Sequence, residues 1–121
     1  VRLIVDDVMK FVAREEKRGV KYDAIIMDPP SYGRGKTGET WKIEKMLWPL
    51  VAECMKVLSD KPLFFLLNSY TTGLGPTVIN NILHSAFPNT PGKITTNEIV
   101  LPITGSDKLL PAGISGRWEN K

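Results

Sequence analysis

The run Asp28-Pro29-Pro30-Ser31 is the part of the chain whose residue types and order best suit chemistry. It follows an apolar segment, Ala24-Ile25-Ile26-Met27, and precedes a glycine-rich one. A carboxylate at the carboxyl end of a buried strand lies where open α/β sheets bind ligands. Prolines lack a backbone N–H, so the peptide carbonyls beside them are free to accept hydrogen bonds from a substrate amine or hydroxyl. This corner is therefore a candidate active site, and its alternative role is to end the strand and begin a turn.

The segment before this corner is apolar without interruption, rather than at every second position. Such a pattern is typical of a strand covered on both faces by helices in a parallel sheet. A second strand of this kind, Leu63-Phe64-Phe65-Leu66-Leu67, also ends in polar residues, Asn68-Ser69-Tyr70-Thr71-Thr72. We therefore expect both strands to deliver polar side chains to the same end of the sheet.

The remaining elements follow from apolar periodicity and from the positions of glycine and proline. We expect a short strand at residues 3–5, helices at about 7–18, 43–58 and 78–86, and a final pair of strands at 94–103 and 109–118. Pro49 should kink the second helix or begin its main part, and Pro102 and Pro111 suit edge positions in a hairpin. This order predicts an α/β fold whose sheet is mostly parallel, with an antiparallel terminal hairpin.

Composition limits the class of protein. The chain has 121 residues, of which 42% are hydrophobic and 24% charged, as expected for one domain spanning residues 1–121. It has neither a run of roughly 20 apolar residues nor an amino-terminal signal, so we expect a cytoplasmic protein without a membrane partner. The single cysteine, Cys54, lies on an apolar helical stripe, and it excludes an internal disulfide framework and a thiolate-rich metal site. The formal net charge of +3 permits a nucleic-acid partner without requiring one.

The segment 33–38 is rich in glycine and is predicted to be a flexible loop. Its residues Gly35-Lys36-Thr37 match the end of the phosphate-binding pattern G-x-x-x-x-G-K-[ST]. However, Pro30 stands where that pattern requires its first glycine, and the segment continues through Gly38 instead of starting a helix. A degenerate P-loop nucleotide-binding protein is therefore a weakly supported alternative.

Three segments together resemble a known family. They are Asp6-Asp7-Val8, the stretch from Tyr22 to Ser31, and the stretch from Leu66 to Thr71. In this order they resemble the carboxyl-terminal two-thirds of a class I S-adenosylmethionine-dependent methyltransferase. The resemblance is strongest to the bacterial group that includes the large-subunit ribosomal RNA cytosine-C5 methyltransferases and their uncharacterised relatives. In that group an acidic pair follows the third strand, a D-P-P motif the fourth and a polar motif the fifth.

The resemblance implies a Rossmann-like methyltransferase domain that transfers a methyl group from S-adenosylmethionine, with RNA or another nucleic acid as the first acceptor to consider. Asp7 would accept a hydrogen bond from the adenine amino group, the backbone N–H of Val8 would meet the ring, and Asp6 is a weaker candidate for the same work. Asp28 would lie beside the methyl donor. Without the resemblance, the acidic pair would be explained by helix capping.

The resemblance also places residues around the acceptor. It implies that Pro29, Pro30, Ser31 and Tyr32 line one side of the target pocket, and that Asn68, Ser69 and Tyr70 line the other. Cytosine-C5 methylation needs a cysteine nucleophile, but serine, asparagine and tyrosine occupy the positions where relatives place one. Direct transfer to a nitrogen or an oxygen fits better, with Asp28 and the Pro29 carbonyl orienting the acceptor.

Part of the family pattern belongs upstream of Val1, including the glycine-rich loop that cradles the methionine portion of the cofactor. The sheet is accordingly expected to lack its first two strands, and the chain to be a fragment that by itself binds the cofactor weakly and is inactive. Exposed strand edges would then favour self-association. Two alternatives stay open: the segment 3–5 pairs directly beside the Asp28 strand, or the chain is a non-catalytic α/β module that binds a partner.

Overall fold

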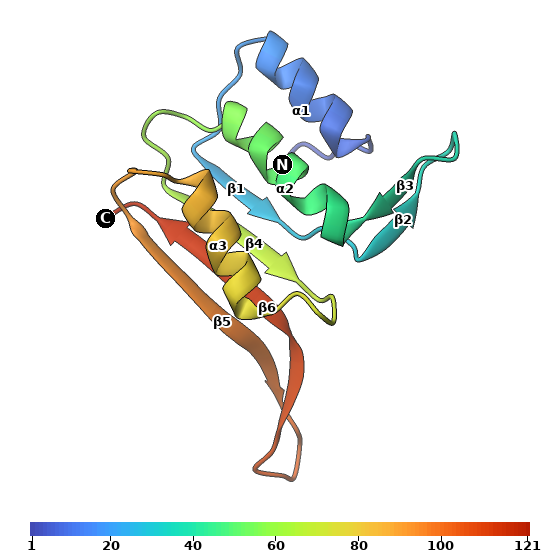
Figure 1. Cartoon of the computed structure of the whole chain (residues 1–121), viewed down its shortest axis with the longest axis vertical. Helices are drawn as coiled ribbons and strands as arrows, with labels where there is room; N and C mark the ends of the chain where they lie inside the picture. Colours follow the sequence, from blue (N-terminus) through green and yellow to red (C-terminus); the bar gives the residue numbers. More distant parts are fainter.

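The computed structural model describes all 121 residues, as three helices on one side of a four-stranded sheet and a separate two-stranded hairpin (Figure 1). The elements in chain order are α1 (Val8–Lys17), β1 (Ala24–Met27), β2 (Tyr32–Arg34), β3 (Thr40–Lys42), α2 (Ile43–Lys56), β4 (Phe64–Ser69), α3 (Pro76–Ala86), β5 (Lys93–Pro102) and β6 (Leu109–Glu119). The three predicted helices and the strands β1, β4, β5 and β6 are confirmed. Pro49 lies inside α2, so the prediction that it begins the main part of that helix is wrong.

The sheet has the order β1-β4-β6-β5. β1 and β4 run parallel, with Ile25 opposite Phe65, whereas β6 pairs antiparallel with both β4 and β5. The terminal hairpin is thus confirmed, but the prediction of a mostly parallel sheet is wrong. The reason is that β6 inserts between β4 and β5, which makes two of the three ladders antiparallel.

The core lies between the sheet and the helices. Phe65 and Leu67 of β4 are completely buried, as are Ile79 and Leu83 of α3. The Phe87 ring stacks on the Trp118 ring with centroids 4.3 Å apart and meets the Phe65 ring edge-on at 5.9 Å. This packing fixes β4, and with it the corner that follows β4, against the helices.

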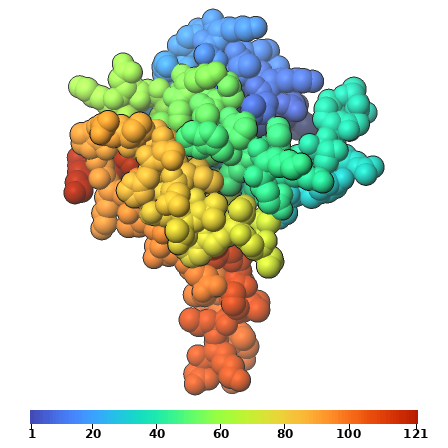
Figure 2. Space-filling view, in the orientation of Figure 1, coloured from blue at the N-terminus to red at the C-terminus, as the bar shows by residue number.

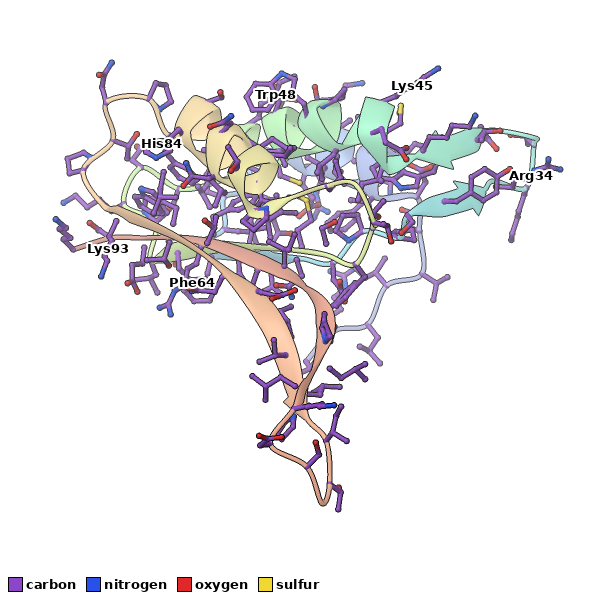
Figure 3. The ribbon with its side chains drawn as sticks, turned by 60° about the horizontal axis from the view of Figure 1, so that its bottom comes forward. Arg34, Lys45, Trp48, Phe64, His84 and Lys93 are labelled. Atoms are coloured by element: carbon purple, nitrogen blue, oxygen red, sulfur yellow. The ribbon has the colours of Figure 1, made fainter.

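The opposite face of the sheet is not covered by helices (Figure 3). Ile26 of β1 is 67% exposed on this face, and Phe64 and Leu66 of β4 are only half-buried. The guanidinium carbon of Arg117 lies 5.8 Å from the centroid of the Phe64 ring and covers part of it. The prediction that helices cover both faces is therefore wrong for these residues, because α1, α2 and α3 all pack on one side.

Residues 1–5 form no strand, and Val1, Leu3 and Val5 are almost fully exposed. The predicted strand at 3–5 is wrong because an apolar run becomes a strand only where a neighbouring strand pairs with its backbone groups, and none lies there. β1 has β4 as its single partner. The alternative in which the segment 3–5 pairs beside β1 is therefore also wrong.

The glycine-rich segment 33–38 contributes Gly33 and Arg34 to β2, and residues 35–38 form the turn to β3, so the predicted loop is confirmed except at its first two residues. β2 and β3 pair antiparallel, and the backbone N–H of Gly35 donates to the Glu39 carbonyl at 2.7 Å. Gly38 has φ +88°, a value that glycine adopts without strain. The glycines thus serve the turn of the hairpin, which projects from the body of the molecule (Figure 1).

The distal part of the β5–β6 hairpin also projects from the body (Figure 2). β4 pairs with β6 only from Ile114 to Glu119, so Pro111 lies beyond the end of that ladder and blocks no bond to β4. Pro102, at the end of β5, lies opposite Leu109. Both prolines therefore occupy positions without a second neighbouring strand, as predicted.

Candidate active site

A cavity of about 540 Å³ lies between α1, β1 and α2. This volume falls within the range of small-molecule sites. The lining is mostly hydrophobic, and its acidic groups are Asp7 at the start of α1, Glu15 within α1, and Asp28 after β1. The Glu15 carboxylate is already paired within the protein, because it accepts hydrogen bonds from Arg18 at 2.9 Å and from the Tyr22 hydroxyl at 2.5 Å. The acidic groups left for a ligand are therefore Asp7 and Asp28.

Asp7 is the N-cap of α1, and its Oδ1 accepts the backbone N–H of Lys10 at 3.0 Å. No hydrogen bond uses its second carboxylate oxygen. Val8 is the first residue of the helix, where a backbone N–H lacks an intrahelical partner. Both residues line the cavity. Capping and ligand binding are thus compatible at Asp7.

Asp6 has a different environment. Its carboxylate forms an ion pair with Arg14 and accepts the backbone N–H of Asp7 at 2.8 Å. The Arg14 guanidinium, which donates to Asp6, lowers the pKa of that carboxyl below its usual value. Asp6 does not line the cavity. Its position therefore favours an ion pair on the surface over contact with a ligand.

The corner after β1 combines exposed and anchored groups. Asp28 and Pro30 are exposed, Pro29 is buried, and all three line the cavity. The indole N–H of Trp41 donates to the Pro30 carbonyl at 2.6 Å, whereas no hydrogen bond uses the Pro29 carbonyl. The corner thus keeps a carboxylate and one carbonyl without a protein partner.

The corner after β4 lies directly beside the first. The hydroxyl oxygens of Ser31 and Thr71 are 2.6 Å apart, which confirms that the two strands bring their polar ends together. Ser69 is 1% exposed, and its hydroxyl accepts the backbone N–H of Thr71 at 3.4 Å. Asn68 is half-buried and Tyr70 is 53% exposed.

Besides Asp6, the predicted site residues that follow Pro30 in the sequence all lie outside the cavity lining: Ser31, Tyr32, Asn68, Ser69 and Tyr70. The residues from Ser31 to Tyr70 are predicted to contact the acceptor, whereas the cavity is lined by Asp7, Val8 and Asp28, which are predicted to bind the cofactor. Ser31 is nonetheless at the junction of the two corners, whereas Tyr32 begins β2 and accepts a hydrogen bond from Arg34 at 2.9 Å.

Sequence reasoning assigned no site role to Trp41 or Thr71, each of which forms a hydrogen bond to a predicted site residue. The only local signal for Trp41 is its position between two polar residues in Thr40-Trp41-Lys42. Such alternation is typical of a short strand with one face packed. Thr71 belongs to the polar cluster predicted after β4, but its contact with Ser31 could not be predicted, because it depends on the spatial order of β1 and β4.

The nucleotide-binding alternative lacks structural support. Lys36 and Thr37 lie in the turn between β2 and β3, and the next helix begins only at Ile43. A P-loop needs its lysine at the start of a helix, whose N-terminus binds the phosphates. The segment therefore cannot present phosphate to a helix in that way.

Cys54 also lines the cavity, but it is 4% exposed. Burial raises the pKa of its thiol to about 11, so the thiol stays protonated at neutral pH and is a poor nucleophile. No group of three or more His, Cys, Asp and Glu side chains is arranged to hold a metal ion. None of the three helices has the length and hydrophobicity of a membrane span.

The solved structures that are similar to this chain include two proteins named as methyltransferases. The chain superimposes on the S-adenosylmethionine-dependent methyltransferase from Agrobacterium tumefaciens with a TM-score of 0.90 and 33% sequence identity, covering 99% of this chain and 40% of that one. The chain has a methyltransferase fold. SMU.776, a proposed methyltransferase solved in complex with SAH, matches with a TM-score of 0.68 and 21% identity, over 96% of this chain and 31% of that one. The chain therefore spans less than half the length of either protein.

No protein-family model matches the chain, and no curated protein matches it. The methyltransferase assignment of the fold thus depends on the three-dimensional arrangement together with the 33% identity to the Agrobacterium protein. The part of the fold that this chain represents includes the two polar corners and the cavity beside them.

Proposed function

We propose that this chain is part of the catalytic domain of an S-adenosylmethionine-dependent methyltransferase. In this proposal the cavity between α1 and β1 receives the adenosine end of the cofactor, and the corner after β1 faces the acceptor. The observation that carries the proposal is that Asp7, Val8 and Asp28, from two separate elements, line one cavity in a chain with a methyltransferase fold. The named function of the Agrobacterium protein supports the same assignment.

The residues of the cavity fit an adenine ring. The ring needs apolar surfaces on its faces and hydrogen-bond partners at its edge. Met27 and Pro29 belong to the apolar lining, the unused oxygen of Asp7 can accept from the amino group, and the Val8 N–H can donate to a ring nitrogen. Asp6 is already paired with Arg14, which favours Asp7 for this contact. When bound, the cofactor supplies a sulfonium methyl group that is already activated for transfer.

The methionine end of the cofactor needs a second set of contacts. The glycines of the segment 33–38 cannot supply them, because they belong to the β2–β3 hairpin. We propose that a glycine-rich loop and the first strands of the domain lie upstream of Val1, in agreement with the 40% of the Agrobacterium protein that this chain spans. The chain by itself is then expected to bind the cofactor weakly and to be inactive.

The acceptor groups support transfer to a nitrogen or an oxygen. The Pro30 carbonyl already accepts the Trp41 indole N–H. The groups left to orient an acceptor amine are therefore the Asp28 carboxylate and the Pro29 carbonyl. Cys54, with its raised pKa, is unsuited to the covalent mechanism of cytosine-C5 transfer. We propose RNA as the acceptor, as in the bacterial large-subunit ribosomal RNA methyltransferase group, and a cytoplasmic location. The free edges of β1 and β5 support self-association of the isolated chain.

The cofactor proposal is tested by calorimetric titration with S-adenosylmethionine. The chain extended upstream through its glycine-rich loop should bind, and the 121-residue chain should bind weakly or not at all. In the extended chain, Asp7→Asn should lower the affinity about tenfold, because a hydrogen bond to a charged group contributes about 1.5–3 kcal/mol. Asparagine is a good N-cap, so α1 is preserved in this variant.

Asp6→Asn is the matched control, since it removes the same charge from a neighbouring residue outside the cavity. It should leave the affinity within twofold of the parent. If the extended chain does not bind the cofactor, or if both variants lose affinity equally, the methyltransferase proposal is wrong and a non-catalytic binding module becomes the better interpretation.

A further inference from the structure

The β2–β3 hairpin has two chemically different faces. In an antiparallel pair, residues directly opposite each other point to the same side. Tyr32 lies opposite Lys42, and Arg34 lies opposite Thr40, so these four side chains share one face, which we call the outer face. Trp41 points to the other side and is bonded to the Pro30 carbonyl. The outer face is therefore held in a fixed position relative to the corner after β1.

The outer face carries two cations and an aromatic ring but no carboxylate, and all four of its side chains are exposed. Lys45, in the first turn of α2, extends it: Lys42, Lys45 and Thr40 line a small hollow of about 220 Å³ with Met46. Figure 3 shows Arg34 and Lys45 near one end of the molecule and Lys93 at the other. Positive charge is thus gathered beside the candidate active site.

The nearby acidic groups do not cancel this charge. In the segment 31–46 they are Glu39 and Glu44. The carboxylate of Glu39 folds back onto the turn, where it accepts from the hydroxyl and the backbone N–H of Thr37. These hydrogen bonds lower the pKa of Glu39, and they direct its charge to the tip of the hairpin. The same segment has four basic residues, Arg34, Lys36, Lys42 and Lys45.

We propose that the outer face of the β2–β3 hairpin binds single-stranded nucleic acid. Arg34, Lys42 and Lys45 contact phosphates, and one base stacks on the exposed ring of Tyr32. Aromatic rings flanked by cations are the surface that unpaired nucleotides recognise, because every base offers a flat face for stacking. An acidic peptide would use the cations but would have no use for the ring, and a duplex hides its base faces.

This inference deepens the proposed function in one respect: a strand bound on the outer face passes beside the corner where the acceptor atom would be methylated. Tyr32 follows Pro30 by only two positions, and its hydroxyl is bonded to Arg34. The hairpin would therefore hold the nucleotides next to the target, while the corner holds the target itself.

Fluorescence anisotropy with a labelled, mixed-sequence 12-nucleotide single-stranded RNA tests the proposal on the 121-residue chain without cofactor. The double variant Arg34→Gln/Lys42→Gln should lower the affinity at least tenfold. It should also reduce the dependence of log K on log salt by about 1.4, since each phosphate contact with a single strand contributes about 0.7. Thermal unfolding should show that the variant remains folded.

The matched control is Lys93→Gln/Lys108→Gln, which removes the same charge from β5 and from the β5–β6 turn. It should change the affinity less than twofold. Tyr32→Ala should lower the affinity about tenfold with an unchanged salt slope, whereas Tyr32→Phe should retain most of it, because stacking needs the ring and not the hydroxyl.

The proposal is overturned if the chain does not bind the RNA, if the control pair loses as much affinity as the hairpin pair, or if Tyr32→Ala has no effect. It is equally overturned if poly-glutamate of the same length binds as tightly, which would indicate an acidic protein partner. Because no cofactor is present, these results are independent of the cofactor titration. RNA binding through the hairpin without cofactor binding by the extended chain would refute the proposed function and leave this inference standing.

Discussion

The corner after β1 and the corner after β4 end two neighbouring parallel strands, but they are held in different ways. The first is held by side chains from outside: Trp41 bonds to the Pro30 carbonyl, and Thr71 contacts Ser31. The second is held from within, because the buried Ser69 hydroxyl accepts the Thr71 N–H two residues later. The two corners are joined by the hydrogen bond between the hydroxyls of Ser31 and Thr71.

The two corners therefore differ in which polar groups they leave without a protein partner. The first corner leaves a carboxylate and a carbonyl without protein partners, which a ligand can use. The second corner satisfies its own serine and rests on the sheet, where Tyr70 packs against Gly113 of β6. We infer that the first corner presents chemical groups and the second supports it. A substitution that disrupts the second corner should therefore lower the free energy of unfolding more than one that disrupts the first corner.

The largest change in stability is expected from Gly113→Ala, because Gly113 of β6 packs against Ser69 and Tyr70 of the second corner. An added Cβ would lie 2.6 Å from Tyr70 Cδ1 and 2.8 Å from the Ser69 carbonyl oxygen, at a φ of +146°. Steric overlap and backbone strain together should lower the free energy of unfolding by about 2–4 kcal/mol, measured by urea denaturation.

Gly75→Ala is the matched control, because a Cβ there meets nothing within 4 Å. It should cost less than about 1 kcal/mol, the typical loss when alanine occupies an N-cap. Equal losses at the two glycines would show that the second corner is not the rigid support that we infer.

A smaller effect is expected from Trp41→Phe, which removes the external anchor of the first corner. Loss of the hydrogen bond to the Pro30 carbonyl should lower the free energy of unfolding by about 1 kcal/mol. It should also speed hydrogen exchange at the Ile43 amide, which donates to the Ser31 carbonyl at 3.2 Å. Trp48→Phe, at a side chain 45% exposed, should change stability by less than about 0.5 kcal/mol. If Trp41→Phe changed neither the stability nor the hydrogen exchange at Ile43, the Trp41 hydrogen bond would not hold the first corner in place. The prolines alone would then have to do so.

The smallest change in stability is expected for the hydrogen bond between Ser31 and Thr71, which joins the two corners. A double-mutant cycle of Ser31→Ala and Thr71→Val should give a coupling energy of about 0.5–1 kcal/mol, since the two hydroxyls share one hydrogen bond. Ser31→Ala combined with Thr90→Val should be additive within about 0.5 kcal/mol, because Thr90 bonds locally to Pro88 in the loop before β5. Additivity in the first cycle would mean that the corners are mechanically independent.

Prediction from sequence succeeded where one element carries its own signal. The continuous apolar runs of β1 and β4, the helical stripe of α2, and Asp7 as a cap can each be recognised from a few neighbouring residues. It failed where a pairing partner decides the structure: the segment 3–5 is as apolar as a strand but has no neighbouring strand, and Gly33 and Arg34 have loop composition but pair with β3.

The candidate site divides in the same way. Asp28 at the end of β1 and the polar residues after β4 were predicted, because parallel strands necessarily place their carboxyl ends together. The bond from Trp41 to Pro30 and the contact between Ser31 and Thr71 were not, because each joins residues that sequence alone does not place in contact. The separation of Asp6 from the cavity likewise depends on where Arg14 points.

The sequence by itself determined which groups stand at the strand ends, since strand and cap signals act over a few residues and the backbone carries each side chain to a known end of its element. Only the tertiary structure decided which of those groups are free. A carbonyl or carboxylate is available to a ligand when no other side chain satisfies it, and the partners of Asp6 and Pro30 are chosen by packing. For this chain, that choice leaves the second Asp7 oxygen, the Asp28 carboxylate and the Pro29 carbonyl without a protein partner.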